Sequence, residues 1–257
     1  LNHSPIPKIG ELVIMKKLAW KYTNNFYENC TAVTTPSAAM KRELIKNGLN
    51  KKVEVISNGV NLKLFYPRKI TNKKFRILYV GRISYEKNID VVIKAVGEFA
   101  KKIKDFEFWI VGSGPDVEKL KHLVKKLKIE KYTRFIGGID NSKLPEIYSN
   151  PGVFVTGSTI ETEGIVLLEA MACGLPIIGV NARAIPDLIK NEVNGFIVNP
   201  EDYKNMSRVI DVIYCNPDLR KKMAKEAIST AGRYNVERCV ERLEKVYHLL
   251  LRHSAGK

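Results

Sequence analysis

Short apolar runs alternate with amphipathic stretches along most of this 257-residue chain. From Phe75 onward, each apolar run has the length of a buried strand, and the stretches between them show the apolar spacing of helices. Strands are expected at residues 76–80, 106–111, 133–136, 153–156, 176–180 and 195–198. Helices are expected at 90–103, 116–127, 143–148, 165–173 and 185–190, and then to the end of the chain. This alternation predicts an α/β fold with a doubly wound parallel sheet covered on both faces.

The first 66 residues follow a sparser pattern. A turn-like start leads into a helix that runs to about residue 30, and a second helix at 38–46 lies between strands expected at 31–35 and 53–56. Ser37 is placed to cap that second helix and Gly48 to end it. Two strands are too few for an independent α/β domain, so this part needs upstream sequence or a partner. The basic, polar stretch 67–74 is interpreted as a linker.

The basic charge of the chain raises the question of whether it binds nucleic acid or an anionic membrane surface. The net charge is +16, but no nucleic-acid-binding motif is present, so no nucleic acid partner is expected. The charge is spread along the chain, which fits either a solvated basic surface or attraction to an anionic membrane surface. Residues 8–27 mix lysines with large apolar side chains and support the membrane alternative, although a core helix with outward lysines shows the same pattern.

The cysteines and the hydropathy bear on the compartment. Four cysteines lie far apart without metal-site spacing, which suits buried free thiols in a reducing cytosol. No apolar run is long enough to span a membrane, and no signal peptide is visible. We therefore expect a cytoplasmic protein, located peripherally at the membrane if its basic surface meets lipid.

Two loops that follow strands carry residues suited to a phosphorylated ligand. In parallel sheets, ligands bind beyond the carboxyl ends of the strands. Gly81, Arg82 and Lys87 follow strand 76–80, and their cations can stabilise a departing diphosphate. A glycine turn with surface charges would look the same. The turn from Gly112 to Pro115 fits equally a backbone close to a ligand and a plain turn.

The loop and helix from Glu161 to Glu169 carry most of the functional argument. Glu161 stands in the loop, where it can face a hexose, and Gly164 precedes the apolar helix 165–173. The start of that helix offers N–H groups and a positive dipole end to a diphosphate. Glu169, about one turn into the helix, can reach ribose hydroxyls. The alternative is that one glutamate caps the helix and the other is solvated.

These segments, in this order, resemble the retaining glycosyltransferases of the GT-B fold, specifically the group 1 type of glycosyltransferase family four. The resemblance rests on Gly81-Arg82 with Glu86-Lys87, on Gly112 to Pro115, on Glu161 to Glu169 followed by Ala-Met-Ala-Cys-Gly-Leu-Pro176, and on Asn194-Gly195. It covers residues 31–252 and implies a GT-B-like architecture. In that architecture, 1–66 would be a remnant of a Rossmann-like N-terminal acceptor domain and 67–74 the linker. Residues 75–234 would be the C-terminal nucleotide-sugar donor-binding domain, and 235–257 a helix that either crosses back to the N-terminal part or packs on its own domain.

The resemblance also implies a role for each matching residue. Arg82 and Lys87 would hold the donor diphosphate, Glu161 the donor sugar and Glu169 the ribose. His3, in a His3-Ser4 pair similar to the family's His-Thr element, would lie near the acceptor and complete the catalytic set with Arg82, Lys87 and Glu161. The remaining donor-binding positions are Gly81, Gly112, Phe135, Ile136 and Gly137, with Gly164 and Ile165 at the phosphates. No D-x-D metal motif is present, so neither a metal nor another cofactor is expected.

Two departures from the family pattern matter. Glu163 stands where the family often carries an aromatic residue, and its charge is unfavourable near a diphosphate unless it points away or meets a hydroxyl. The family's acceptor domain is longer than residues 1–66. The chain would accordingly be a fragment, the product of a truncated gene, or a subunit completed by a separate chain.

The leading prediction is a retaining hexosyltransferase. It would move a sugar from a nucleotide-diphosphate sugar to a lipid or saccharide acceptor. One alternative is a donor-binding module or truncated subunit that is inactive without an N-terminal acceptor domain. Another is a sugar epimerase of similar architecture.

Overall fold

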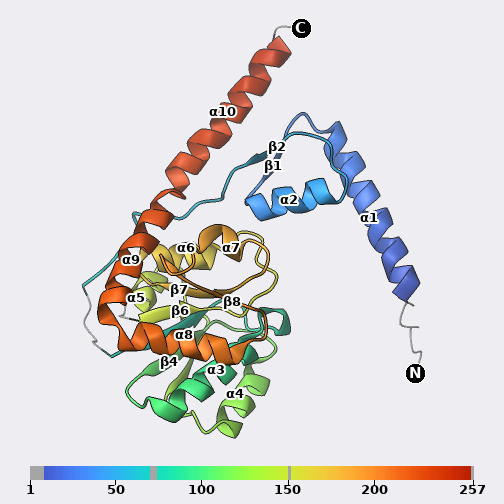
Figure 1. The fold of residues 1–257 in the computed structure, drawn as a ribbon. Helices are drawn as coiled ribbons and strands as arrows, with labels where there is room; N and C mark the ends of the chain where they lie inside the picture. The colour runs from blue at the N-terminus through green and yellow to red at the C-terminus, as the bar shows by residue number, and fades with distance from the viewer. Residues whose placement is uncertain (1–8, 70–73, 150–151, 256–257) are drawn as a thin grey trace.

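The computed structural model describes residues 9–69, 74–149 and 152–255, and its centre is a six-stranded sheet (Figure 1). The strand order is β5-β4-β3-β6-β7-β8, and every neighbouring pair is parallel. The strands are β3 (Arg76–Val80), β4 (Glu107–Val111), β5 (Thr133–Gly137), β6 (Gly152–Val155), β7 (Ile177–Val180) and β8 (Gly195–Val198). The order runs outward in both directions from the β3–β6 pair, which confirms the doubly wound α/β sheet predicted from the sequence.

Helices cover both faces of this sheet. Figure 1 shows α6 (Ile165–Ala172) and α7 (Ile185–Leu188) on one side. On the other side lie α3 (Ile89–Lys102), α4 (Val117–Lys126) and α8 (Tyr203–Cys215), with α3 packed along α8. Helix α5 (Leu144–Tyr148) and helix α9 (Pro217–Gly232) both pack against α6. A short 3₁₀-helix, η1 (Tyr85–Lys87), was not expected from the sequence.

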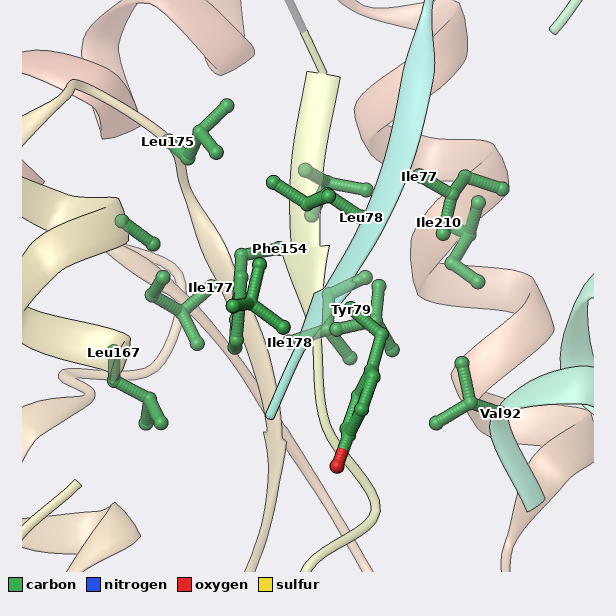
Figure 2. Close-up of a cluster of buried hydrophobic side chains, with 14 of the residues drawn as sticks. Ile77, Leu78, Tyr79, Val92, Phe154, Leu167, Leu175, Ile177, Ile178 and Ile210 are labelled. Carbon is green, nitrogen blue, oxygen red and sulfur yellow. The ribbon is translucent and has the colours of Figure 1, made fainter. Parts of the chain in front are cut away.

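The core lies between these layers and is built on the central strand. All five residues of β3 are buried, as expected for a strand covered on both faces. Figure 2 shows Ile77, Leu78 and Tyr79 of β3 with side chains from the neighbouring strands and helices: Phe154, Ile177, Ile178, Val92, Ile210 and Leu167. Full burial of each large apolar side chain contributes roughly 1.5–3 kcal/mol, so the sheet is a firm base for the loops at its carboxyl edge.

The N-terminal segment forms a separate small unit above the sheet (Figure 1). Helix α1 (Ile9–Asn29), strand β1 (Val33–Thr35), helix α2 (Ala38–Lys46) and strand β2 (Val53–Val55) follow in order, and β1 pairs with β2 in parallel. Ser37 caps α2 as predicted, accepting a hydrogen bond from the Met40 N–H. A small cluster joins these elements, formed by Val33, Leu44, Leu49 and Val53 with Trp20, Tyr27 and Cys30 against it.

Helix α10 (Val236–Ala255) leaves the sheet and runs outward beside the N-terminal segment (Figure 1). An Arg242 Nη2 donates a hydrogen bond to the Val55 carbonyl at 2.7 Å, and Lys63 pairs with Glu237 at 2.6 Å. The first half of α10 therefore contacts the end of β2 and the chain that follows it. The division into domains at residues 67–74 stays a prediction.

The structure bears on the expectations about the cysteines and about membrane-spanning helices. All four cysteines are free, with Cys173 and Cys239 buried and Cys30 half-buried, but Cys215 is exposed near the end of α8, so the expectation of buried thiols was wrong there. Across the described ranges, no helix combines the length and apolarity needed to cross a bilayer.

Candidate active site

The candidate site lies at the carboxyl edge of the sheet, beside the β3–β6 pair. Strand order reverses at this pair, and in doubly wound sheets the connections at such a reversal leave in opposite directions, which is where ligands bind; we call this place the crevice. The loop after β3 contributes Gly81, Arg82 and Lys87, and the loop after β6 contributes Glu161 and Gly164. The topology therefore brings these two loops together, and the third loop that the sequence singled out, Gly112 to Pro115, contacts the loop after β3 through the Ile83 N–H, which donates to the Ser113 carbonyl at 2.8 Å.

Lys87 and Glu161 meet directly across this crevice. The Lys87 Nζ lies 2.7 Å from the Glu161 Oε1, and the side chains are only 18% and 15% exposed. Lys87 ends the 3₁₀-helix η1, and Asn88 then turns the chain with a φ of 48°. The Asn88 side chain also donates a hydrogen bond to the Gly157 carbonyl at 3.2 Å, which ties the two loops together. Lys87, which was predicted to bind phosphate, and Glu161, which was predicted to bind sugar, are therefore in direct contact.

Arg82 lies in the same loop but reaches toward solvent. Its side chain is 65% exposed and pairs with Glu86, which also accepts a hydrogen bond from the Ser84 hydroxyl at 2.7 Å. That hydroxyl, together with Arg82, keeps the pKa of Glu86 below its ordinary value, so Glu86 is ionised. The backbone of Arg82 is fixed, because its carbonyl accepts a hydrogen bond from the Tyr79 hydroxyl at 3.0 Å. Burial raises the pKa of Tyr79, which keeps that hydroxyl protonated.

Glycines allow the loops after β3, β4 and β5 to touch through their backbones. The Gly81 N–H donates to the Val111 carbonyl at 3.0 Å, and the Gly112 N–H donates to the Gly137 carbonyl at 2.8 Å. Gly112 has a φ of 135°, and a Cβ there would lie 1.9 Å from the Gly81 carbonyl oxygen. The Gly112 to Pro115 turn is thus shaped by the neighbouring loop. In contrast, a Cβ on Gly137 would meet nothing within 4 Å, so the space beside that residue is open.

Helix α6 begins beside the crevice with its amino end uncapped. Gly164 is the N-cap residue, in the left-handed region with a φ of 82°, and no side chain accepts a hydrogen bond from the first turn. Ile165, the first residue of the helix, is only half-buried. An uncapped helix start leaves N–H groups and the positive end of the dipole available for an anion.

Glu169 lies farther along α6 and has a partner that the sequence analysis missed. The Tyr148 hydroxyl of α5 donates a hydrogen bond to the Glu169 Oε2 at 2.9 Å. Tyr148 is fully buried, and burial raises its pKa well above the ordinary value. Burial also raises the pKa of Glu169, while the Tyr148 hydrogen bond opposes that rise. The other carboxylate oxygen, Glu169 Oε1, takes no part in the hydrogen bond with Tyr148.

Glu163 points away from the crevice, toward the N-terminal segment. Its side chain is buried and accepts hydrogen bonds from the Ser57 hydroxyl, the Asn58 N–H and the Asn58 side chain. The unfavourable placement beside a diphosphate, which the sequence left open, is therefore avoided. No local pattern could have identified these partners, because they lie more than a hundred residues earlier in the chain.

The remaining predicted site residues are Phe135, Ile136 and His3. Phe135 and Ile136 are half-buried in β5, next to the open space at Gly137. His3 lies outside the described residues. A cleft of about 750 Å³ is found elsewhere, between the N-terminal segment and α7, α9 and α10, and its lining includes Glu163 but none of Arg82, Lys87, Glu161 and Glu169. We place the site by the converging charged groups, because volume alone does not indicate chemistry.

Comparison with known proteins identifies the family of the chain. The family model for glycosyl transferases group 1 matches residues 63–230. The chain belongs to that family. A second model, glycosyltransferase family 4, matches residues 2–64 of this group 1 glycosyltransferase.

Relatives and solved structures extend the comparison. The alpha-monoglucosyldiacylglycerol synthase of Acholeplasma laidlawii is 29% identical over 248 residues, which are 90% of this chain and 61% of the relative. Sucrose-phosphate synthase from Thermosynechococcus elongatus has a similar structure, with a TM-score of 0.83 at 25% identity, covering 92% of this chain and 62% of that one. Anabaena HepE, solved with UDP, has a TM-score of 0.81 at 20% identity, covering 90% and 68%. The fold is that of the GT-B glycosyltransferases, and the chain spans only part of the length of these proteins.

Proposed function

We propose that this glycosyltransferase moves a hexose from a nucleoside diphosphate sugar to an acceptor hydroxyl, with retention of anomeric configuration. The observation that carries the proposal is the meeting of Lys87 and Glu161 beside the uncapped start of α6. A cation and open N–H groups suit a diphosphate, and a carboxylate beside them suits sugar hydroxyls. Group 1 family membership supports the same conclusion.

In the proposed reaction, the bond between the anomeric carbon and the diphosphate oxygen breaks, and its electron pair goes to the diphosphate. Lys87, Arg82 and the N–H groups of Gly164 and Ile165 stabilise that growing charge more than they stabilise the intact donor. The acceptor oxygen bonds to the anomeric carbon on the same face, and its proton goes to a leaving phosphate oxygen. Glu161 binds the sugar after releasing Lys87.

The nucleoside end of the donor is assigned to the remaining positions. Glu169, held on one oxygen by Tyr148, would bind ribose hydroxyls with the other. The base would lie in the open space beside Phe135, Ile136 and Gly137. We further propose that no metal ion is needed, because the two cations and the helix start can balance the diphosphate charge. Transfer that persists in excess EDTA would agree with this, and loss of transfer restored by a divalent cation would contradict it.

The test of the donor site is calorimetric titration of the chain with UDP, GDP and uridine. Arg82→Ala is expected to weaken UDP or GDP binding about tenfold while changing uridine binding less than about twofold, because guanidinium–phosphate bonds are charge-assisted. Lys121→Ala, which removes an exposed lysine paired with Glu118 on α4, is the matched control and should leave all three affinities unchanged. Equal diphosphate affinity in the Arg82→Ala variant and the wild type would remove the assigned role.

The acceptor is proposed to be a lipid at an anionic membrane surface, reached from the cytoplasm. The name of the Acholeplasma relative describes a lipid product, and α1 of this chain presents apolar side chains beside lysines. A saccharide acceptor is the alternative, as the name of the sucrose-phosphate synthase illustrates. His3 would lie near the acceptor, so His3→Ala is expected to lower transfer while leaving UDP binding unchanged.

A second candidate function follows from the lengths of the relatives, since this chain spans 61% of the Acholeplasma protein. It is a donor-binding module that needs an acceptor domain, supplied by upstream sequence or by another chain. Assays of sugar transfer and donor hydrolysis on residues 1–257 separate the two. Donor binding without turnover, rescued by an added upstream domain, would favour the module.

A further inference from the structure

Glu163 is a buried carboxylate that the proposed reaction does not use. It is 6% exposed and immediately precedes Gly164, the N-cap of α6. Burying a carboxylate is costly unless its oxygens are hydrogen-bonded, so the partners of Glu163 indicate what it does. Those partners belong to the N-terminal segment rather than to the donor-binding part of the chain.

One turn satisfies both carboxylate oxygens. The Ser57 hydroxyl donates to Oε1 at 2.5 Å, and the Asn58 N–H donates to the same oxygen at 2.8 Å. The Asn58 side-chain amide donates to Oε2 at 2.5 Å. All three donors are neutral groups, and each carboxylate oxygen accepts at least one hydrogen bond from them. We call this set of contacts the Glu163 tether.

The turn that holds Glu163 is itself fixed at the base of α10. A Cβ on Gly59 would lie 2.6 Å from the Val236 Cα, so the two backbones touch. The Val60 N–H donates to the Tyr234 carbonyl at 2.7 Å, and the Val236 N–H donates to the Val60 carbonyl at 3.1 Å. The turn that carries the tether is therefore fixed by backbone contacts to the segment between α9 and α10.

A second contact joins the same two regions. The Ser37 hydroxyl, at the start of α2, donates to the Thr162 carbonyl at 2.5 Å. Thr162 and Glu163 lie between Glu161 and Gly164, which are the two residues of this loop assigned to the sugar and the phosphates. Both inner residues of the loop are thus bound to the N-terminal segment, while both outer residues are the ones assigned to the proposed donor.

We propose that Glu163 is a positioning residue, which sets the place of Glu161 and of the α6 start by fastening loop 161–164 to the Ser57–Asn58 turn. The inference rests on the proposed function and deepens it, because donor geometry then depends on the N-terminal segment. Small displacements of groups that bind phosphate and sugar have large effects on affinity and rate. Ser57 lies 106 residues before Glu163 and is not assigned to the donor, so the contact by which it reaches loop 161–164 is its hydrogen bond to Glu163.

The experiment uses the full chain with UDP-glucose, UDP and uridine as probes in calorimetric titrations. Ser57→Ala is expected to raise the Kd for UDP-glucose about five- to tenfold and the Kd for uridine less than about twofold. Ser57→Thr, which keeps the hydroxyl, should restore the wild-type value. The pair Ser57→Ala and Glu163→Gln should be non-additive, so that the double variant binds no more weakly than Glu163→Gln alone.

The matched control is Asn61→Ala in the same connection. The Asn61 side chain accepts hydrogen bonds from the Lys63 and Leu64 N–H groups, so its loss perturbs the turn locally without touching loop 161–164. It should bind all three probes as the wild type does. Thermal unfolding checks that each variant is folded at the titration temperature.

The outcomes separate the two proposals. Binding of UDP-glucose by Ser57→Ala within twofold of the wild type, or equal weakening for uridine and UDP-glucose, would overturn the positioning role and leave the donor site standing. A wild-type chain that binds neither UDP nor UDP-glucose would overturn the proposed function, and the tether's role with it.

Discussion

At the residue scale, the pairing of Tyr148 with Glu169 has an energetic consequence. Both side chains are largely withdrawn from water, and burial raises the pKa of each. An ionised Glu169 is therefore disfavoured in the folded protein relative to the unfolded chain. Sites that bind ligands often carry such costs, since the group is arranged for the ligand rather than for the empty protein.

We expect Glu169→Gln to stabilise the protein while weakening nucleotide binding. Because the folded-state pKa is raised, ionisation of Glu169 lowers the free energy of unfolding as pH rises through the ordinary carboxyl range toward the raised value. The gain from Glu169→Gln should therefore be full at pH 7–8 and should shrink as pH falls below about 4, where both states are protonated. Urea unfolding across this pH range measures it, with UDP titration alongside.

Glu130→Gln, on an exposed side chain, is the control for that measurement and should change neither property. A Glu169→Gln protein that unfolds at lower urea than the wild type at pH 7–8 would contradict the expectation.

Among single residues, the sequence predicted which charged groups would form the candidate site but not their hydrogen-bond partners. Arg82, Lys87, Glu161 and Glu169 were all expected, and Lys87 and Glu161 do meet. Tyr148 was missed because a tyrosine in a short helix carries no local sign that it faces a glutamate 21 residues later. Partners separated along the chain are decided by the packing of whole elements, which local patterns do not describe.

At the element scale, the loops after β3 and β4 pass so close to each other that Gly112 has no room for a side chain. Gly112 has a φ of 135°, and a Cβ there would lie 1.9 Å from the Gly81 carbonyl oxygen, which is backbone and cannot swing away. Gly112→Ala is therefore expected to lower the free energy of unfolding by about 3 kcal/mol or more, from clash and backbone strain together. Urea unfolding measures the loss.

Gly138→Ala is the comparison for that variant. A Cβ on Gly138 would lie 3.7 Å from the Ser113 hydroxyl oxygen, which is ordinary contact, so the change should stay within about 0.5 kcal/mol. Similar losses in the two variants would show that the crossing of the two loops is not the cause.

The positions of most helices and strands were predictable because apolar runs and amphipathic stretches alternate clearly along the chain. Strands β3 and β8 and helix α2 have the expected bounds, and the other strands begin and end close to theirs. The 3₁₀-helix η1 was missed, since three residues are too few to show a period. Pairing order was not readable from the pattern either, because every buried strand looks alike along the chain.

At the scale of the whole molecule, the basic charge is widely distributed, so its effect has to be separated from that of one helix. Helix α1 exposes Ile14, Met15, Leu18, Tyr22 and Phe26, and Lys16, Lys17 and Lys21 are exposed beside them. An apolar stripe beside lysines suits the interface of an anionic bilayer. Overall charge alone would attract the protein to such a surface through any basic face.

Reversal of charge in α1 separates these effects. We expect Lys16→Glu, Lys17→Glu and Lys21→Glu together to reduce binding to phosphatidylglycerol vesicles at least tenfold, since each juxtamembrane lysine contributes about 1 kcal/mol. Lys125→Glu, Lys126→Glu and Lys128→Glu change the net charge equally on an exposed face at the end of α4 and should reduce binding much less. Vesicle sedimentation measures both. Equal losses would assign the attraction to net charge and remove α1 from the lipid-facing role.

The ion pairs at the crevice also bear on how an anion would enter it. Lys87 is paired with Glu161 and Arg82 with Glu86, so each cation of the candidate site already has a carboxylate as its counter-ion. Under the proposed function, the diphosphate would therefore have to displace these carboxylates from the two cations. If the proposed donor role holds, the sugar hydroxyls of the donor give the displaced Glu161 new hydrogen-bond partners, whereas inorganic phosphate brings no sugar, so the proposed site should favour the nucleotide sugar over free phosphate.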